Sequence, residues 1–87
     1  MNKNDKYFVY ENWQAENKAV VHISSCGHAS EGHNRLNDYT APNDRWFGYF
    51  ETLPEAIAFA SLLPNRQLKL CGHCLRQEKK IFEMTVN

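Results

Sequence analysis

Two short stretches, His22-Ile-Ser-Ser-Cys26 and Cys71-Gly-His-Cys74, decide how this chain folds. Each stretch begins and ends with a side chain that can ligate a metal ion. Zn²⁺ takes four Cys or His ligands in a tetrahedron and has no d-electron preference for another geometry. A distant pair of ligands can therefore close the site that a CxxC pair begins. We expect His22, Cys26, Cys71 and Cys74 to hold one zinc ion.

Each candidate ligand also has another interpretation. The CxxC could be a redox pair, but thioredoxin-like proteins place that motif near the start of a βαβ unit, whereas here it stands near the end of the chain. Unreactive thiols are the other alternative. Cys26 could be a small buried apolar residue. His22 has the best spacing for the fourth ligand, and His28 remains a substitute because a C-x-H pair can chelate a metal.

Length and composition indicate one domain spanning residues 1–87. A chain of this size buries only about 60–65% of its unfolded surface, so a structural metal would help to stabilise it. Ten basic and ten acidic side chains give no net charge, and hence no long-range attraction to nucleic acid or an anionic membrane. The charged residues 1–5, expected to be disordered, lack the apolar region of a signal peptide, and no stretch is apolar enough to span a bilayer. With an odd number of cysteines, this predicts a cytoplasmic protein without disulfides.

Alternation of apolar residues predicts a small α+β domain. Residues 7–13 and 19–24 indicate an antiparallel β-hairpin, and residues 46–50 indicate a third strand whose Gly48 marks a bulge or a close backbone approach. In the second strand, Val21 and Ile23 should share one face and Val20 and His22 the other. The expected sheet is therefore the hairpin alone or three strands.

The remaining segments should form one central helix, a loop and a terminal CxxC knuckle. Thr52-Leu-Pro-Glu55 has the signature of a capping box, in which Glu55 reaches back to the Thr52 amide, and the apolar run to Leu63 continues the helix. Residues 27–45 are rich in Gly, Ser, Asn, Asp and Pro and indicate a long loop. Residues 75–86 fit either a helix or a strand.

The order of these features resembles the Ada-like metal-binding domain, a small zinc module with CxxxC followed by CxxC. The matching positions are His22, Cys26, Cys71 and Cys74, with Phe50, Glu55 and Ala56 before the second pair. The resemblance implies a zinc site. In the bacterial DNA repair protein that typifies the family, the first cysteine also accepts a methyl group from a DNA phosphotriester. His22 replaces that nucleophile, so we do not expect the methyl-acceptor activity. Residues 27–45 are an insertion that the family pattern lacks, so the resemblance does not imply a shared DNA-binding surface.

Three functional classes fit these features. The first is a structural zinc module that binds an unidentified protein partner, since aromatic residues concentrate at interfaces. The second is a nucleic-acid-binding zinc protein that uses basic and aromatic groups around the loop and the CxxC. Its candidate residues are Arg35, Arg45, Trp46, Lys69, Arg76 and Lys79. The third is an enzyme, but four protein ligands leave no metal position for water, so neither catalysis nor a small-molecule substrate is expected.

Overall fold

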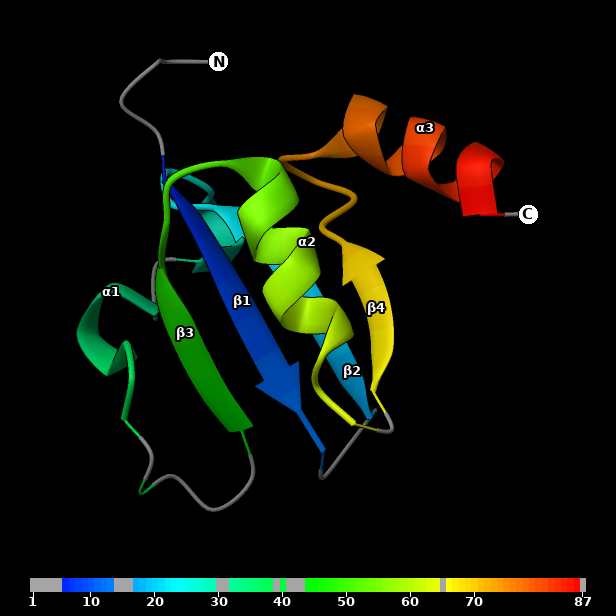
Figure 1. The fold of residues 1–87 in the computed structure, drawn as a ribbon. Coiled ribbons are helices and arrows are strands. Elements are labelled where there is room, and N and C mark those ends of the chain that lie inside the picture. The colour runs from blue at the N-terminus through cyan, green and yellow to red at the C-terminus, as the bar shows by residue number, and fades with distance from the viewer. Residues whose placement is uncertain are drawn as a thin grey trace.

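A computed structural model describes residues 6–13, 17–29, 32–38, 40, 44–64 and 66–86, apart from the side chains of 28 and 82–86. It is a small α+β fold in which a four-stranded sheet carries a helix across one face (Figure 1). The elements in chain order are β1 (Tyr7–Asn12), β2 (Lys18–Ile23), the 3₁₀ helix η1 (Gly27–Ala29), α1 (Gly32–Arg35), β3 (Asp44–Phe50), α2 (Leu53–Ser61), β4 (Gln67–Leu70) and α3 (Arg76–Val86).

The sheet has the strand order β3-β1-β2-β4. The predicted hairpin is present, because β1 and β2 pair antiparallel from Tyr7 opposite Ile23 to Asn12 opposite Lys18. β3 pairs antiparallel with the other edge of β1. The predicted limit of three strands is wrong, because β4 pairs parallel with β2. Gln67–Leu70 pair with Lys18–Val21, so β4 becomes the edge strand on this side of the sheet.

α2 covers one face of the sheet. Its buried Ala56 and Ala60 pack into a core with Val21 and Phe47, and small side chains there let the helix lie close to the strands. The helix begins at the predicted place, since the Thr52 hydroxyl accepts a hydrogen bond from the Glu55 amide at 3.3 Å. The Glu55 carboxylate accepts from the Thr52 hydroxyl at 3.0 Å, where the capping box had predicted the Thr52 amide as donor.

The opposite face carries a second apolar cluster that contains Phe8, Val20 and Trp46. Val20 and Val21 thus lie on opposite faces of β2, as their alternation predicts. The predicted loop 27–45 is not one loop in its described part, because it includes η1 and α1 and its end belongs to β3. α1 lies close to Trp46: a Cβ built on Gly32 would stand 2.6 Å from the indole ring. Packing against the sheet therefore orders residues whose composition suggested a loop.

The last segment of the chain is the helix α3, which decides between the two predictions for 75–86. Leu75, just before it, is fully buried against the α2 side of the sheet, and the helix then projects away from the sheet (Figure 1). Across the described part of the chain, every helix is too short or too polar to cross a membrane.

Candidate metal centre

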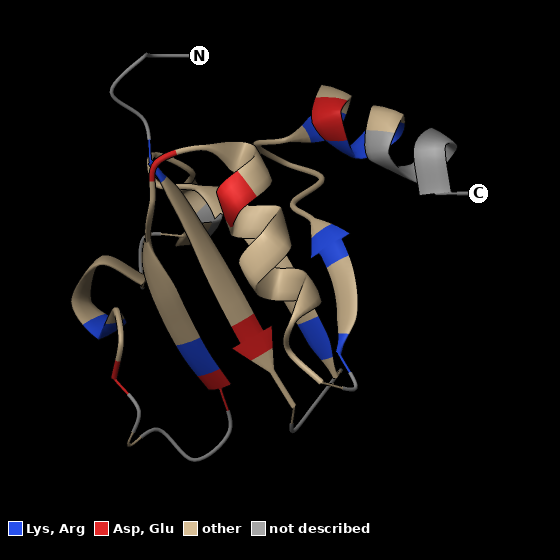
Figure 2. Cartoon of the chain, viewed as in Figure 1, with Lys and Arg blue, Asp and Glu red and all other residues tan. Residues whose placement is uncertain are grey.

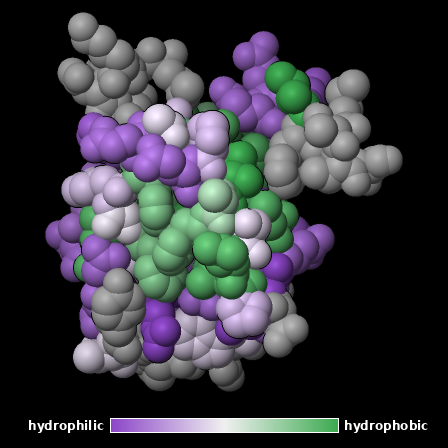
Figure 3. Space-filling model, viewed as in Figure 1, coloured by the Kyte–Doolittle hydropathy of each residue, from purple (hydrophilic) through white to green (hydrophobic). Residues whose placement is uncertain are grey.

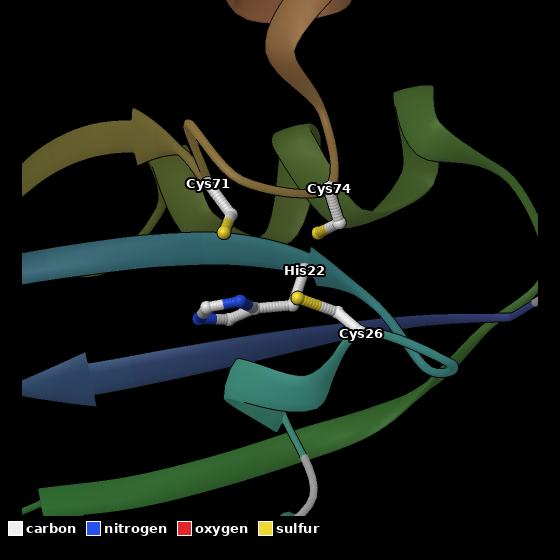
Figure 4. A group of neighbouring side chains, drawn as sticks. All are labelled: His22, Cys26, Cys71 and Cys74. Carbon is white, nitrogen blue, oxygen red and sulfur yellow. The ribbon is translucent and has the colours of Figure 1, made fainter.

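Four side chains from two distant parts of the chain converge at one end of the sheet (Figure 4). They are His22 on β2, Cys26 after it, and Cys71 and Cys74 in the loop that follows β4. One potential ligand atom from each lies within 4.8 Å of those of the other three. The structure thus brings together all four residues that the spacing had selected, in a buried cluster that could bind a metal ion.

The parallel pairing of β2 with β4 produces this convergence. Val21 lies opposite Leu70 in two parallel strands, so the residues that follow them, His22 on β2 and Cys71 just after β4, come side by side. The Cys71 amide extends the ladder by donating to the Val21 carbonyl at 2.9 Å. Cys26 returns through a tight turn in which its amide donates to the Ile23 carbonyl at 2.9 Å. Backbone hydrogen bonds therefore fix the main-chain positions of three candidate ligands, His22, Cys26 and Cys71.

The donor set fits a tetrahedral zinc ion. With Zn–S bonds of about 2.3 Å, the sulfur atoms of such a site lie about 3.8 Å apart. The candidate ligand atoms here lie within 4.8 Å of one another, so their greatest separation exceeds that of a zinc-bound set by only about 1 Å. His22, Cys26 and Cys71 are each less than a tenth exposed. Burial of an imidazole beside three thiols is costly without a partner that uses their lone pairs, and a metal ion is such a partner.

Backbone amides point at two of the sulfur atoms. The Ile23 amide donates to Cys74 Sγ at 3.3 Å, and the His73 amide donates to Cys71 Sγ at 3.4 Å. Burial opposes ionisation of Cys71, but hydrogen bonds from the Cys74 and His73 amides and from the other two thiols outweigh it and lower its pKa. Burial raises the pKa of Cys74, and the neighbouring thiols raise it further against the opposing Ile23 amide. Without a cation, Cys71 therefore loses its proton more readily than Cys74.

The structure describes the side chain of only one of the two histidine candidates for the fourth ligand. His22 is buried beside Cys26, and the centre of its ring lies 5.5 Å from that of Trp46. The side chain of His28 lies outside the described residues. The structure thus places His22 at the cluster, and the choice of His28 as a substitute stays untested.

The predicted nucleic-acid residues fall into separate groups. Arg35 pairs with Asp44, beside β3. Arg45 follows Asp44 on β3, and its guanidinium lies 4.9 Å from the centre of the Trp13 ring. Trp46 is only 4% exposed, so its ring is largely unavailable for stacking against a base. Successive residues of a strand point to opposite faces, so Arg45 lies on the other face of β3 from Asp44 and Trp46.

Lys69 and Lys79 are brought together with Trp46, by contrast, around a pocket of about 570 Å³. Arg76, the first residue of α3, is exposed and does not line this pocket. The pocket also contains His22, Cys71 and a further residue, Lys18, that the sequence analysis did not select. The two-residue period of β2 places Lys18 on the same face as His22, and this signal could have identified it.

Comparisons with family models, with curated proteins and with solved structures found no match for this chain.

Proposed function

We propose that this protein is a structural zinc module that acts by binding other molecules. His22, Cys26, Cys71 and Cys74 would hold one Zn²⁺, which joins the end of β2 to the loop after β4. The observation that supports this most strongly is the buried convergence of four zinc-type donors within 4.8 Å. A domain of 87 residues has a thin core, and zinc binding contributes directly to the folding free energy of such domains.

The donor set favours a structural role for the metal over a catalytic one. Catalytic zinc usually has three protein ligands and an open position for water, whereas structural sites have four and are rich in cysteine. Zinc would link the two parts of the chain through its four coordination bonds, and its two positive charges would neutralise two of the three thiolates that ligate it. The amides of Ile23 and His73 already point at two of those sulfur atoms, which stabilises thiolates in place.

The relation to the Ada-like domain is part of this proposal, and it extends to the metal site alone. The order HxxxC, α2, β4 and CxxC supports it. An imidazole at position 22 cannot accept an alkyl group as a thiolate does, so the proposed module lacks methyl-acceptor chemistry.

The outer surface of α2 supports a protein partner. Glu55 is the only charged residue between Leu53 and Ser61, and Ala58 is exposed. Leu62, at the C-terminal cap, is 80% exposed. Figure 3 shows the resulting apolar surface over α2. Apolar surface on a small domain is typical of an interaction site.

Titration of the metal-free protein with Co²⁺ tests the metal site. Three thiolates and one imidazole should give the absorption bands of a tetrahedral cobalt site, saturating at about one equivalent. His22→Ala should weaken the affinity, whereas His73→Ala, which changes an exposed residue inside the CxxC, is the matched control and should not. Absence of a tetrahedral spectrum in the wild-type protein would refute the proposal.

A further inference from the structure

The pocket beside the metal cluster lies on the face of the sheet that α2 does not cover. Val20 and Trp46 belong to the apolar cluster of that face, and both line the pocket. Its volume of about 570 Å³ is within the range of about 300–1,000 Å³ that is usual for small-ligand sites. His22 and Cys71 form part of its wall, so the proposed zinc site would help to fix its shape.

Three lysines from three different elements give the pocket its charge. Lys18 comes from β2, Lys69 from β4 and Lys79 from α3. The side chain of Lys79 lies beside Gly72 of the CxxC loop, since a Cβ built on Gly72 would stand 3.8 Å from the Lys79 Nζ. In Figure 2, basic segments of β4 and α3 lie on the same side of the molecule. The fold thus gathers ammonium groups that the sequence keeps far apart.

Among the described residues, carboxylates are scarce in the lining of the pocket. Asp44 is the single carboxylate among the described residues that line the pocket. It is already engaged by the Arg35 guanidinium and by the Tyr10 hydroxyl, which donates to it at 2.7 Å. A zinc ion with three thiolates would add one negative charge. The pocket therefore remains positive in the metal-loaded protein and suits an anion.

The wall of the pocket is also partly aromatic. The ring centres of Tyr10 and Trp46 lie 4.6 Å apart, and Tyr10 retains partial exposure while Trp46 is nearly covered. Tyr10 can therefore contact a planar group while its ring packs against that of Trp46. A cationic site beside an aromatic wall matches the two parts of a nucleotide, namely a phosphate and a base.

We propose, on the basis of the structural zinc module, that this pocket binds a phosphorylated nucleoside. Lys18, Lys69 and Lys79 hold the phosphate oxygens, and the Tyr10 side of the pocket contacts the base. The nucleotide is either free or one unit of a single strand. A duplex offers its phosphates but keeps its bases stacked away from such a pocket.

Binding to the zinc-loaded full chain tests this inference. The probes are AMP, adenosine, inorganic phosphate, and a labelled single-stranded oligonucleotide with its duplex, all at low salt. We expect AMP to bind more tightly than adenosine or phosphate. An oligonucleotide that binds far more tightly than AMP identifies a single strand as the source, and equal affinity identifies a free nucleotide. The proposal would be overturned if neither AMP nor the single-stranded oligonucleotide binds saturably, or if the duplex binds as tightly as the single strand.

Charge variants test the lysines. The double variant Lys69→Gln, Lys79→Gln should weaken binding at least about tenfold, since it removes two charge-assisted contacts. Lys80→Gln makes the same kind of change at the exposed neighbour of Lys79, outside the pocket lining, and should weaken it less than about twofold. Equal losses would contradict the proposal. Zinc content is measured in the same samples: full zinc without nucleotide binding refutes this inference alone, whereas absence of zinc refutes the proposed function.

Discussion

Gly32→Ala is the substitution that most sharply tests the packing of α1 on the sheet. A Cβ at this position would stand 2.6 Å and 2.9 Å from two atoms of the Trp46 ring and 3.1 Å from the Phe8 ring. Carbon atoms in contact normally lie about 3.5–4.0 Å apart, so the indole would have to move by about 1 Å. Trp46 is 4% exposed and its ring packs against those of Tyr10 and His22, so it has little room to move.

The cost follows from this crowding. Overpacking a core costs about 1–3 kcal/mol, and the better helix propensity of alanine recovers at most about 1 kcal/mol. α1 has only four residues, so most of that recovery is lost. We expect the free energy of unfolding to fall by about 1–2 kcal/mol, with a melting temperature lower by about 4–8 °C for each kcal/mol.

Urea denaturation followed by tryptophan fluorescence, with zinc in excess, measures this change. Gly27→Ala is the matched control, because nothing lies within 4 Å of a Cβ at Gly27 and its backbone does not have a positive φ. Its stability should stay within about 0.5 kcal/mol of wild type. A Gly32→Ala protein as stable as wild type, or equal losses in both variants, would refute the packing of α1 against Trp46.

Two further substitutions test the core and the ion pair of β3. Leu75→Ala removes a fully buried side chain and should lower the free energy of unfolding by about 2–5 kcal/mol. Leu62→Ala, at a site 80% exposed, should change the free energy of unfolding by less than about 0.5 kcal/mol. Similar urea midpoints for the two variants would contradict this difference. The hydrogen bond from Arg35 lowers the pKa of Asp44, and burial opposes this effect. The Asp44 carboxylate therefore contributes its full stabilisation above its ordinary pKa of 3.8, and loses it only as the pH falls through the lower pKa that it has in the folded protein. The stability difference between wild type and Asp44→Asn, about 0.5–1.5 kcal/mol, should therefore be constant from about pH 7 to pH 5, and a difference that shrinks over this range would show that the carboxyl titrates higher.

The local elements were predictable because neighbouring residues determine them. Alternation in residues 19–24 gave the faces of β2, and the Thr52 hydroxyl gave the start of α2. The tail was ambiguous because Leu75, Lys79 and Phe82 have helical spacing whereas residues 81–86 also alternate as a strand would, and the structure shows a helix. Local signals of this kind identify an element without identifying its neighbours.

Long-range pairing was not predictable. The fourth strand, Gln67–Leu70, was not predicted as part of the sheet, because its parallel alignment with β2 depends on the path of the whole chain. The composition of 27–45 did not reveal α1, because its position depends on Trp46, which lies outside that range. The four candidate ligands were found from spacing alone, whereas the lysine pocket was not, because Lys18 and Lys69 meet only through the pairing of β2 with β4.

The metal content of the purified protein tests the central claim most directly. Elemental analysis of protein that has been freed of loosely bound metal should give about one zinc per chain. A chelator strong enough to remove that zinc should unfold the domain, and the Cys71→Ser, Cys74→Ser variant should neither retain zinc nor fold cooperatively. A folded wild-type protein with far less than one zinc per chain, or a double variant that folds undisturbed, would contradict the account.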